Sequence, residues 1–214
     1  MKFYGQFNPP VDKVLYERYF KNKKNLTSIE CGAFDGLTEN CTKFLEENLN
    51  WNTINIEPLP HIFKKLKLNR PSSININIAL SDTNEKKTIR VYDIHGHGIN
   101  NTNASLCHLP KHRQLLERKS NNKYKDFEIY TMTYSSLIKE QKINELDLFV
   151  LDVEGHEYEV IDGMKDAEIF PKVFVIEHGH RKPEDIVNKL KVLPVSYKLD
   201  FISHVNSYFV RIDE

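Results

Sequence analysis

The sequence predicts an α/β fold built on a doubly wound, mostly parallel sheet. Short apolar runs that suit buried strands alternate along the chain with amphipathic runs that suit helices. One run, residues 146–153, is almost continuously apolar, as is typical of a central parallel strand covered on both faces. Because the alternation shows no internal repeat and no linker, we expect a single domain over residues 1–214.

Length and charge limit the classes of protein to consider. The chain has 214 residues, enough for one medium-sized domain with a proper core. Its 30 Lys and Arg balance its 30 Asp and Glu, which argues against a general polyanion binder. We therefore expect no nucleic-acid partner.

Hydropathy and cysteine content indicate the compartment. No apolar run approaches the roughly 20 residues that a membrane span needs, and the first residues lack a signal-peptide core. The three cysteines include no CxxC pair, so neither a disulfide framework nor a cysteine zinc site is indicated. We expect a cytoplasmic protein without a membrane span.

The first 25 residues are predicted to form a helical extension. Two consecutive prolines precede residues 11–20, whose apolar residues recur at helical spacing. A strand then leads up to Ile29, and a glycine-containing turn follows. The next amphipathic run, with Leu37 and Phe44 on one face, predicts a helix directly after this turn.

The remaining chain continues the alternation. Further strands are predicted at residues 51–57, 72–80, 88–92, 127–133, 146–153, 173–176, 197–203 and 207–212. Helices are predicted after Pro58, at residues 134–142, around Tyr158 and at residues 183–193.

Residues 93–126 form a long insertion between two predicted strands. The insertion contains four histidines and a short predicted helix around Leu115. Between His108 and Lys125 it carries six basic residues and one acid. Loops of this length in compact domains are usually functional or disordered. We expect a lid over an acceptor site, with a positive face for an anionic group; a solvated surface helix is the alternative.

The turn at residues 32–36 has the composition of a ligand-binding turn. Gly32 and Gly36 allow the backbone to approach a ligand closely, because glycine has no Cβ. There is no Gly-Lys-Ser/Thr for a phosphate loop, and the spacing GxxxG differs from the dinucleotide pattern GxGxxG. An ordinary glycine turn without ligand is the alternative.

Acids follow successive predicted strands. Glu30, Glu57 and Asp82 stand at three strand ends, and parallel strands bring these ends to one edge of the sheet. Glu57 lies about one βαβ step after the glycine turn, where doubly wound folds place a carboxylate on a ribose diol. A nucleoside-bearing ligand without a pyrophosphate, such as S-adenosylmethionine (SAM), fits this combination.

Several segments resemble the FkbM-type SAM-dependent methyltransferases. They are Gln-Phe at 6–7, Ile-Glu-Cys-Gly-Ala-Phe-Asp-Gly at 29–36, Ile-Glu-Pro at 56–58, Ala-Leu-Ser-Asp at 79–82, Ala-Ser-Leu at 104–106, Asp-Val-Glu-Gly-His-Glu at 152–157 and Val-Ile-Glu at 175–177. The resemblance implies a Rossmann-like class I methyltransferase with a mostly parallel seven-stranded sheet and an antiparallel last strand. It also implies O-methylation of a sugar hydroxyl in a glycan, polysaccharide or glycosylated product.

The resemblance further implies a set of SAM-binding residues. Glu30, Gly32, Ala33, Asp35 and Gly36 are expected to shape the methionine pocket. Glu57 and Pro58 are expected at the ribose. Ser81 and Asp82 are expected beside the adenine, and Ser105 and Asp152 near the sulfonium.

Methyl transfer to a hydroxyl needs a group that removes the proton. The candidates at the predicted strand ends are Glu154, His178, Asp152, His156 and His180. Alternatively, Asp152, Glu177 and His178 could bind Mg²⁺ or Mn²⁺, which would acidify a coordinated sugar hydroxyl.

Two other functions stay open at this stage. One is an NAD-dependent oxidoreductase, which the missing GxGxxG disfavours. The other is a catalytically silent SAM-fold domain that serves as an interaction module.

Overall fold

The centre of the computed structural model, which describes residues 1–94, 96, 98–179 and 181–212, is a seven-stranded sheet. Its strand order is β3-β2-β1-β7-β8-β10-β9. The strands are β1 (Thr27–Cys31), β2 (Asn52–Ile56), β3 (Ile74–Ile76), β7 (Leu148–Leu151), β8 (Val173–Glu177), β9 (Ser196–Ser203) and β10 (Asn206–Ile212). Neighbouring strands are parallel except at β10, which runs antiparallel to both β8 and β9. The predicted α/β fold with an antiparallel last strand is confirmed.

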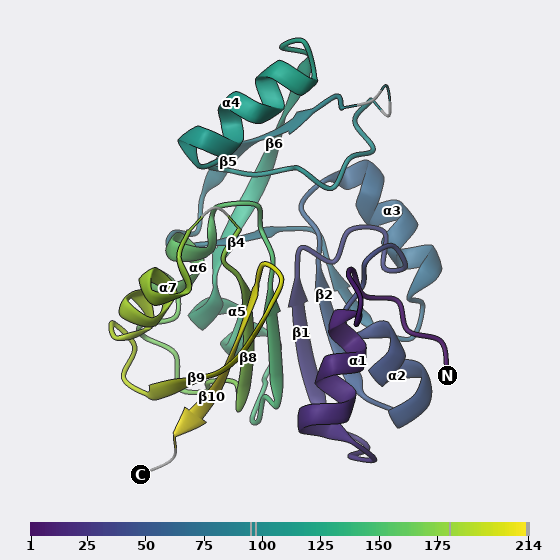
Figure 1. The fold of residues 1–214 in the computed structure, drawn as a ribbon, viewed down its shortest axis with the longest axis vertical. Helices are drawn as coiled ribbons and strands as arrows, with labels where there is room; N and C mark the ends of the chain where they lie inside the picture. Colours follow the sequence, from purple (N-terminus) through teal and green to yellow (C-terminus); the bar gives the residue numbers. More distant parts are fainter. Residues whose placement is uncertain (95, 97, 180, 213–214) are drawn as a thin grey trace.

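Helices cover both faces of this sheet, as Figure 1 shows. They are α1 (Val11–Leu15), the π-helical turn η1 (Tyr16–Phe20), α2 (Lys43–Leu49), α3 (Pro60–Asn69), α5 (Tyr134–Glu140), α6 (Glu157–Asp162) and α7 (Pro183–Leu190). Side chains alternate between the faces of β7: Phe149 and Leu151 pack with α5, α6 and α7, whereas Leu148 and Val150 pack with α1, η1 and α2. All four are buried, which explains the continuous apolar run.

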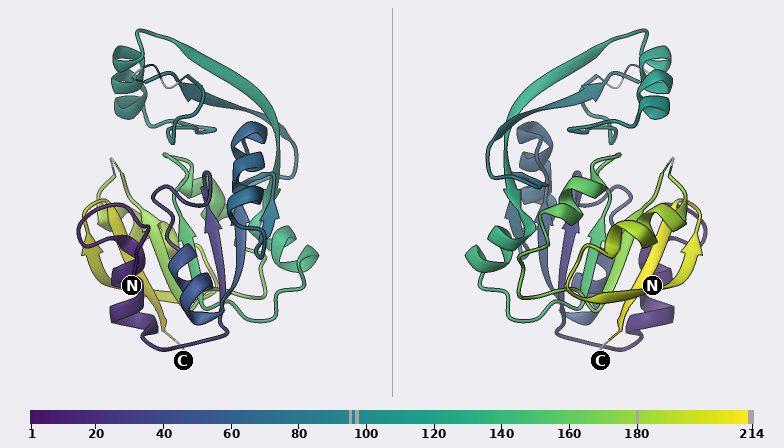
Figure 2. Two further views of the ribbon diagram at one scale, coloured as in Figure 1. Left: turned by 90° about the vertical axis from the view of Figure 1, so that its right-hand side faces the viewer. Right: turned by 90° about the vertical axis from the view of Figure 1, so that its left-hand side faces the viewer.

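A second, three-stranded sheet carries the insertion over the main sheet. It has the order β4-β6-β5, with β4 (Ala79–Ser81), β5 (Lys86–Tyr92) and β6 (Tyr124–Thr133). Helix α4 (Pro110–Lys119) lies between β5 and β6 in the chain. In Figures 1 and 2, β5, β6 and α4 stand above the end of the sheet toward which β1 points. The insertion therefore lies over the carboxyl ends of the parallel strands.

The predicted strand at residues 72–80 is instead two strands in different sheets. β3 pairs with β2, whereas β4 pairs with β6. The side-chain amide of Asn77 donates hydrogen bonds to the backbone oxygens of Glu57 and Pro58, at 2.8 and 2.9 Å. These bonds turn the chain out of the main sheet. The sequence had predicted that Asp82 follows a strand of the main sheet, but it follows β4 of the second sheet.

The first helix after the glycine turn begins later than predicted. Asp35 Oδ1 accepts hydrogen bonds from the backbone of Leu37 and Thr38, which folds this stretch into a turn. Leu37 is 37% exposed, so it does not belong to a buried helix face. Helix α2 starts only at Lys43, whose N–H donates to Asn40 Oδ1 at 2.8 Å.

Candidate functional site

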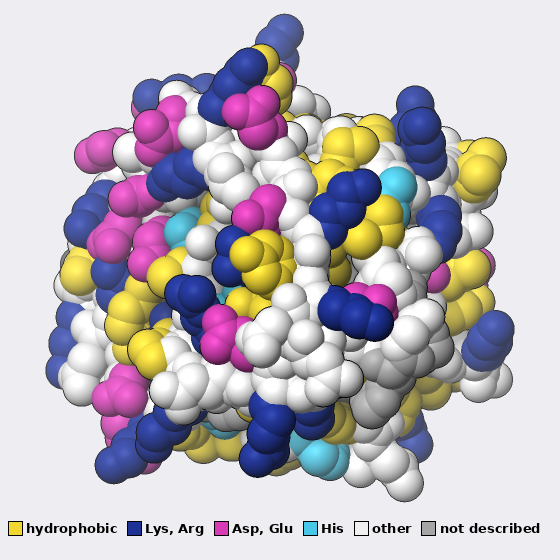
Figure 3. All heavy atoms as spheres, turned by 90° about the horizontal axis from the view of Figure 1, so that it is seen from above, with side chains coloured by type: hydrophobic (Ala, Val, Ile, Leu, Met, Phe, Trp, Pro, Cys, Tyr) yellow, Lys and Arg dark blue, Asp and Glu magenta, His cyan; other side chains and the backbone are white. Residues whose placement is uncertain are grey.

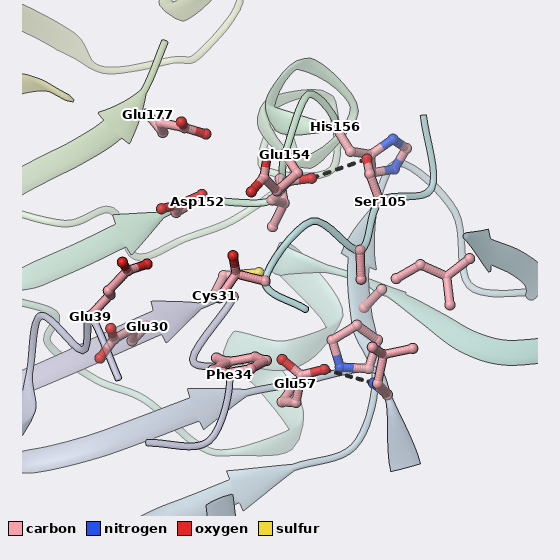
Figure 4. Close-up of a pocket in the computed structure, with 18 of the residues that line it drawn as sticks. Glu30, Cys31, Phe34, Glu39, Glu57, Ser105, Asp152, Glu154, His156 and Glu177 are labelled. Atoms are coloured by element: carbon pink, nitrogen blue, oxygen red, sulfur yellow. Dashed lines mark hydrogen bonds between the residues drawn. The ribbon is translucent and has the colours of Figure 1, made fainter. Parts of the chain in front are cut away.

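A cavity of about 300 Å³ lies at the carboxyl ends of the parallel strands (Figure 4). Its floor comes from β1, β2, β7 and β8 and the turns that follow them. The insertion closes it from above with Asn101, Thr102, Ala104, Ser105 and Leu106, and the N-terminal segment adds Gln6 and Phe7. Figure 4 shows Glu57 and Phe34 at one end and Glu39, Asp152, Glu154 and Glu177 toward the other.

The glycine turn fits tightly against the end of β7. Gly32 has φ +90°, and a Cβ there would lie 1.8 Å from the backbone oxygen of Asp152. Only glycine permits this approach. Of the other residues predicted from this turn, Ala33, Asp35 and Gly36 lie outside the cavity lining. Gly36 packs on Arg70 of α3's end, so these three shape the turn from behind.

Glu57 enters the cavity from the end of β2. It is 5% exposed, and its Oε1 accepts a hydrogen bond from Leu59 N at 2.8 Å. Burial raises the pKa of Glu57 to about 8, because protein surrounds the carboxyl where water would stabilise its charge. Pro58 also lines the cavity.

The wall beside Glu57 is apolar. Ala79 and Leu80 of β4 and Ile89 of β5 line it. Ser81 and Asp82, the predicted adenine contacts, lie outside the lining; Asp82 pairs with Lys87 at 3.1 Å. The turn of the chain at Asn77 thus presents Ala79 and Leu80 to the cavity. The sequence had predicted that Ser81 and Asp82 would face the ligand.

The carboxylate of Glu30 is engaged by the start of α2. It accepts hydrogen bonds from Cys41 N at 2.7 Å and Thr42 N at 3.1 Å, and from the Thr42 hydroxyl. Glu30 is 3% exposed and lines the cavity only from below. These hydrogen bonds hold β1 and the start of α2 together.

Four carboxyl groups gather at the other end of the cavity, namely those of Asp152, Glu154, Glu177 and Glu39 (Figure 4). Burial raises the pKa of Asp152 to about 6, although water reaches its side chain through the cavity. Burial and the charges of Asp152 and Glu154 raise the pKa of Glu177 to about 11. Of the two groups, Glu177 therefore favours its protonated form more strongly than Asp152 does.

Glu154 lies in a strained turn. It has φ +57°, which is uncommon for a residue with a Cβ, and Gly155 follows with φ +110°. A Cβ on Gly155 would lie 2.9 Å from the backbone oxygen of Cys107 in the insertion. Ser105 Oγ also donates to the backbone oxygen of Val153 at 3.2 Å. The insertion is thus docked on the turn that carries Glu154. Burial raises the pKa of Glu154 well above its ordinary value.

The predicted histidines have different surroundings. His156 lines the cavity, but its Nε2 lies 3.0 Å from Ser81 Oγ and its Nδ1 3.4 Å from Glu159 Oε2. His178 lies outside this cavity, and its Nδ1 is 3.0 Å from Ser207 Oγ. Burial lowers the pKa of both imidazoles, so both are neutral at pH 7. His180 lies outside the described residues.

The predicted metal ligands do not converge. Asp152 and Glu177 hydrogen-bond to each other, whereas His178 is directed at Ser207. Within the described part of the chain, no group of three His, Cys, Asp or Glu side chains could hold a metal ion. The predicted Mg²⁺ or Mn²⁺ site is therefore not supported.

A second cavity of about 160 Å³ adjoins the first and shares Glu154, Glu177 and Val205 with it. Its other lining includes Leu109, His112, Glu157, His178 and Arg181. Arg181 is fully engaged: it donates to Glu157 Oε2 at 2.6 Å and to the backbone oxygen of Gly155 at 2.8 Å. The sequence reasoning had missed His112 and Arg181, because their place in the site depends on how distant segments pack.

The sheet topology and the position of the cavity indicate the class of protein. Doubly wound sheets bind nucleotide-bearing ligands beyond the carboxyl ends of their strands, which is where this cavity lies. The family model described as the methyltransferase FkbM domain matches residues 30–210. The chain belongs to this methyltransferase family. This assignment replaces the NAD-dependent alternative.

Comparison with solved structures finds methyltransferases among the similar chains. A methyltransferase FkbM from Methylobacillus flagellatus KT is 15% identical with a TM-score of 0.49, over 92% of this chain and 47% of that one. A TehB-like SAM-dependent methyltransferase from Corynebacterium glutamicum is 8% identical with a TM-score of 0.42, over 88% and 79%. The fibrillarin pre-rRNA processing protein of Methanococcus jannaschii is 12% identical with a TM-score of 0.47, over 96% and 74%.

The extent of these matches is uneven. The chain spans about half the length of the FkbM structure. Comparison with curated proteins finds no match. Among the described residues, no helix combines the length and the apolar character that a membrane crossing requires.

Proposed function

We propose that the chain transfers a methyl group from SAM to a hydroxyl of a sugar in a glycan, polysaccharide or glycosylated product. The observation that carries this proposal is the meeting of two cavities at Glu154 and Glu177. The larger one has the features expected for the donor, and the smaller one carries carboxyl, imidazole and guanidinium groups that could hydrogen-bond a hydroxyl-bearing acceptor.

The residues of the larger cavity fit SAM. Glu57 is the carboxylate for the ribose hydroxyls, with Pro58 beside it. The apolar wall of Ala79, Leu80 and Ile89 offers a face for the adenine ring. The close approach of Gly32 to β7 leaves room for the methionine part.

The four carboxyl groups at the far end suit the charged sulfur. A cation among buried acids lowers their pKa values and favours their ionised forms. SAM has a positive sulfonium and its demethylated product, S-adenosylhomocysteine (SAH), a neutral thioether. Asp152 and Ser105 are therefore proposed near the sulfur, as the sequence motif implies, and Glu30 supports them from below.

Bound SAM supplies a methyl carbon that its sulfonium has already activated. The chain has to exclude water, align the acceptor oxygen and take its proton. The insertion covers the cavity, which serves the first task. Glu154 at the junction and His178 in the smaller cavity are the predicted proton acceptors that face the acceptor side.

The smaller cavity supports an uncharged acceptor. Its volume of about 160 Å³, roughly half that of the larger cavity, leaves room for only part of an extended acceptor. Burial lowers the pKa of His178, one of the two described histidines in its lining, and its Arg181 is already paired with Glu157. Positive and negative side chains are interspersed over the insertion end in Figure 3, which supports a neutral acceptor over a nucleic acid.

The predicted cytoplasmic location is part of the proposal. Cys31, Cys41 and Cys107 are all free thiols, and thiols persist in reducing compartments. The donor is also an intracellular metabolite.

Two paired measurements test the proposed function. Calorimetric titration with SAH should give one saturable site, and [methyl-14C]SAM should label a hydroxylated sugar acceptor. Binding of SAH without transfer to any sugar would instead support the silent interaction module. Absence of SAH binding would contradict both.

A further inference from the structure

The N-terminal segment supplies part of the lining of the larger cavity. Gln6 and Phe7 line it, although they precede residues 30–210, which match the family model. The side-chain amide of Gln6 hydrogen-bonds to the carboxylate of Glu39, which lines the same cavity. Figure 4 shows Glu39 toward the end of the cavity opposite Glu57. An amide and a carboxylate from two separate segments thus meet at that end.

Three contacts hold the N-terminal segment in place. The buried carboxylate of Asp12 accepts a hydrogen bond from the backbone N–H of Gly5 at 3.1 Å. Gly5 also forms an isolated parallel bridge with Glu39. The ring of Phe7 stacks on that of His204, with the centroids 4.5 Å apart and the planes 10° apart. The amide that reaches Glu39 is therefore carried by an anchored stretch of backbone.

We propose that Gln6 and Glu39 bind the amino-acid end of SAM, with the carboxylate of Glu39 on its ammonium group and the amide of Gln6 on its carboxylate. This inference rests on the proposed function, because it concerns the donor in the same cavity. It assigns a specificity-determining role to a segment that precedes the matched family domain.

The rest of the cavity determines the direction of this end. With the ribose at Glu57 and the sulfur near Asp152, the amino-acid chain extends away from the ribose and toward Glu39. Thr38 and Glu39 also line a surface groove with the first residues of the chain. A group that carries two charges loses less hydration beside this groove than it would against the apolar wall.

The lining favours neutral partners for the carboxylate of the donor. Among the described residues that line the larger cavity, none is a lysine or an arginine. Two polar side chains from the insertion already have backbone partners: Asn101 donates to the oxygen of Gly98 at 2.7 Å, and Ser105 to that of Val153 at 3.2 Å. The amide of Gln6 is the lining amide that lies next to Glu39.

An amide paired with a carboxylate is the chemical complement of an amino acid. A glutamine side chain has two N–H donors, so one can stay on Glu39 while the other meets the carboxylate of the donor. The carboxylate of Glu39 has acceptor sites for the ammonium group as well as for the amide.

The backbone supports a functional role for this pair. Phe7, next to Gln6, has φ +77°, and Glu39 has φ +54°. Such conformations cost energy for residues with a Cβ, and strain of this kind gathers at functional sites. The anchoring contacts of the N-terminal segment maintain it.

The test compares two probes by calorimetric titration. SAH carries the amino-acid end, whereas 5′-methylthioadenosine has the same adenine, ribose and sulfur but a methyl group in its place. Wild type should bind SAH at least about tenfold more tightly than 5′-methylthioadenosine, the effect of one hydrogen bond to a charged group. In Gln6→Met and in Glu39→Gln the affinity for SAH should fall by about tenfold. The affinity for 5′-methylthioadenosine should stay within about twofold, which also shows that the variants are folded.

Gln114→Met is the matched control, because it makes the same change at an exposed position of α4 outside the lining of both cavities. Both affinities should stay as in wild type. An unchanged affinity of Gln6→Met for SAH overturns the inference. So does an equal loss for both probes, or a wild type that binds both equally well. A wild type that binds neither probe would instead overturn the proposed function.

Discussion

The substitution Glu57→Gln separates the cost of the buried carboxyl in folding stability from its proposed role in binding the ribose. In the folded protein the pKa of Glu57 is raised to about 8, against an ordinary value of 4.5. A carboxyl whose pKa is raised by folding destabilises the folded protein. This cost grows as the pH rises from about the pKa in the unfolded state to the pKa in the folded state. The amide of glutamine is neutral at every pH and can still accept the hydrogen bond from Leu59, so it removes this cost.

The size of the effect follows from the two pKa values. With 4.5 for the unfolded and about 8 for the folded protein, the cost is about 1 kcal/mol at pH 5 and about 3 kcal/mol at pH 7. The free energy of unfolding of Glu57→Gln should exceed that of wild type by these amounts. The added gain between the two pH values corresponds to roughly 4–8 °C in Tm for a domain of this size.

Two assays together check the prediction for Glu57. Urea denaturation at pH 5 and pH 7, without ligand, gives the free energies of unfolding. Calorimetry with SAH should show that the more stable variant binds at least about tenfold more weakly, since a hydrogen bond to a charged group contributes about 1.5–3 kcal/mol. A stability difference independent of pH would refute the buried-carboxyl argument. Unchanged SAH affinity would refute the ribose role.

Three further substitutions test other parts of the site. Glu177→Gln should stabilise the empty protein by an amount that still grows from pH 7 to pH 9, because its pKa is raised to about 11; equal gains in denaturation at both pH values would contradict this. Gly32→Ala should lower the free energy of unfolding by at least about 2 kcal/mol and abolish SAH binding, because its Cβ would meet the backbone after β7. The control Gly98→Ala, with open space around it, should have a smaller effect on thermal melts. Arg181→Met should cost about 3–5 kcal/mol in chemical denaturation because it leaves Glu157, whose side chain is 1% exposed, without its cation; a loss below about 1 kcal/mol would show that Glu157 is uncharged there.

Much of the fold followed from local pattern. The apolar run at β7 predicted a strand covered on both faces, and helices do cover both. Glu30, Glu57 and Asp82 at strand ends predicted one common edge; Glu30 and Glu57 line one cavity, whereas Asp82 lies outside its lining. These features depend on periodicity and on the direction of parallel strands, which the sequence itself carries.

Other features depend on contacts between distant segments. The amide of Asn77 diverts the chain into a second sheet by bonding the end of β2, and no local pattern marks that bond. Glu30 lines the cavity, but its oxygens also accept hydrogen bonds from the start of α2, a contact that no local pattern marks. The position of His112 depends on the packing of the insertion against Gly155, which lies 43 residues later in the sequence. Composition alone could identify the insertion as unusual, but not that His112 lines the smaller cavity.

The most direct measurement is a crystal structure of the protein with SAH bound. We expect the ribose hydroxyls within hydrogen-bond distance of Glu57, the adenine against Ala79 and Leu80, and the sulfur facing Asp152 and Glu154. A molecule of SAH seated outside this cavity, or held in it with the ribose turned away from Glu57, would contradict the account.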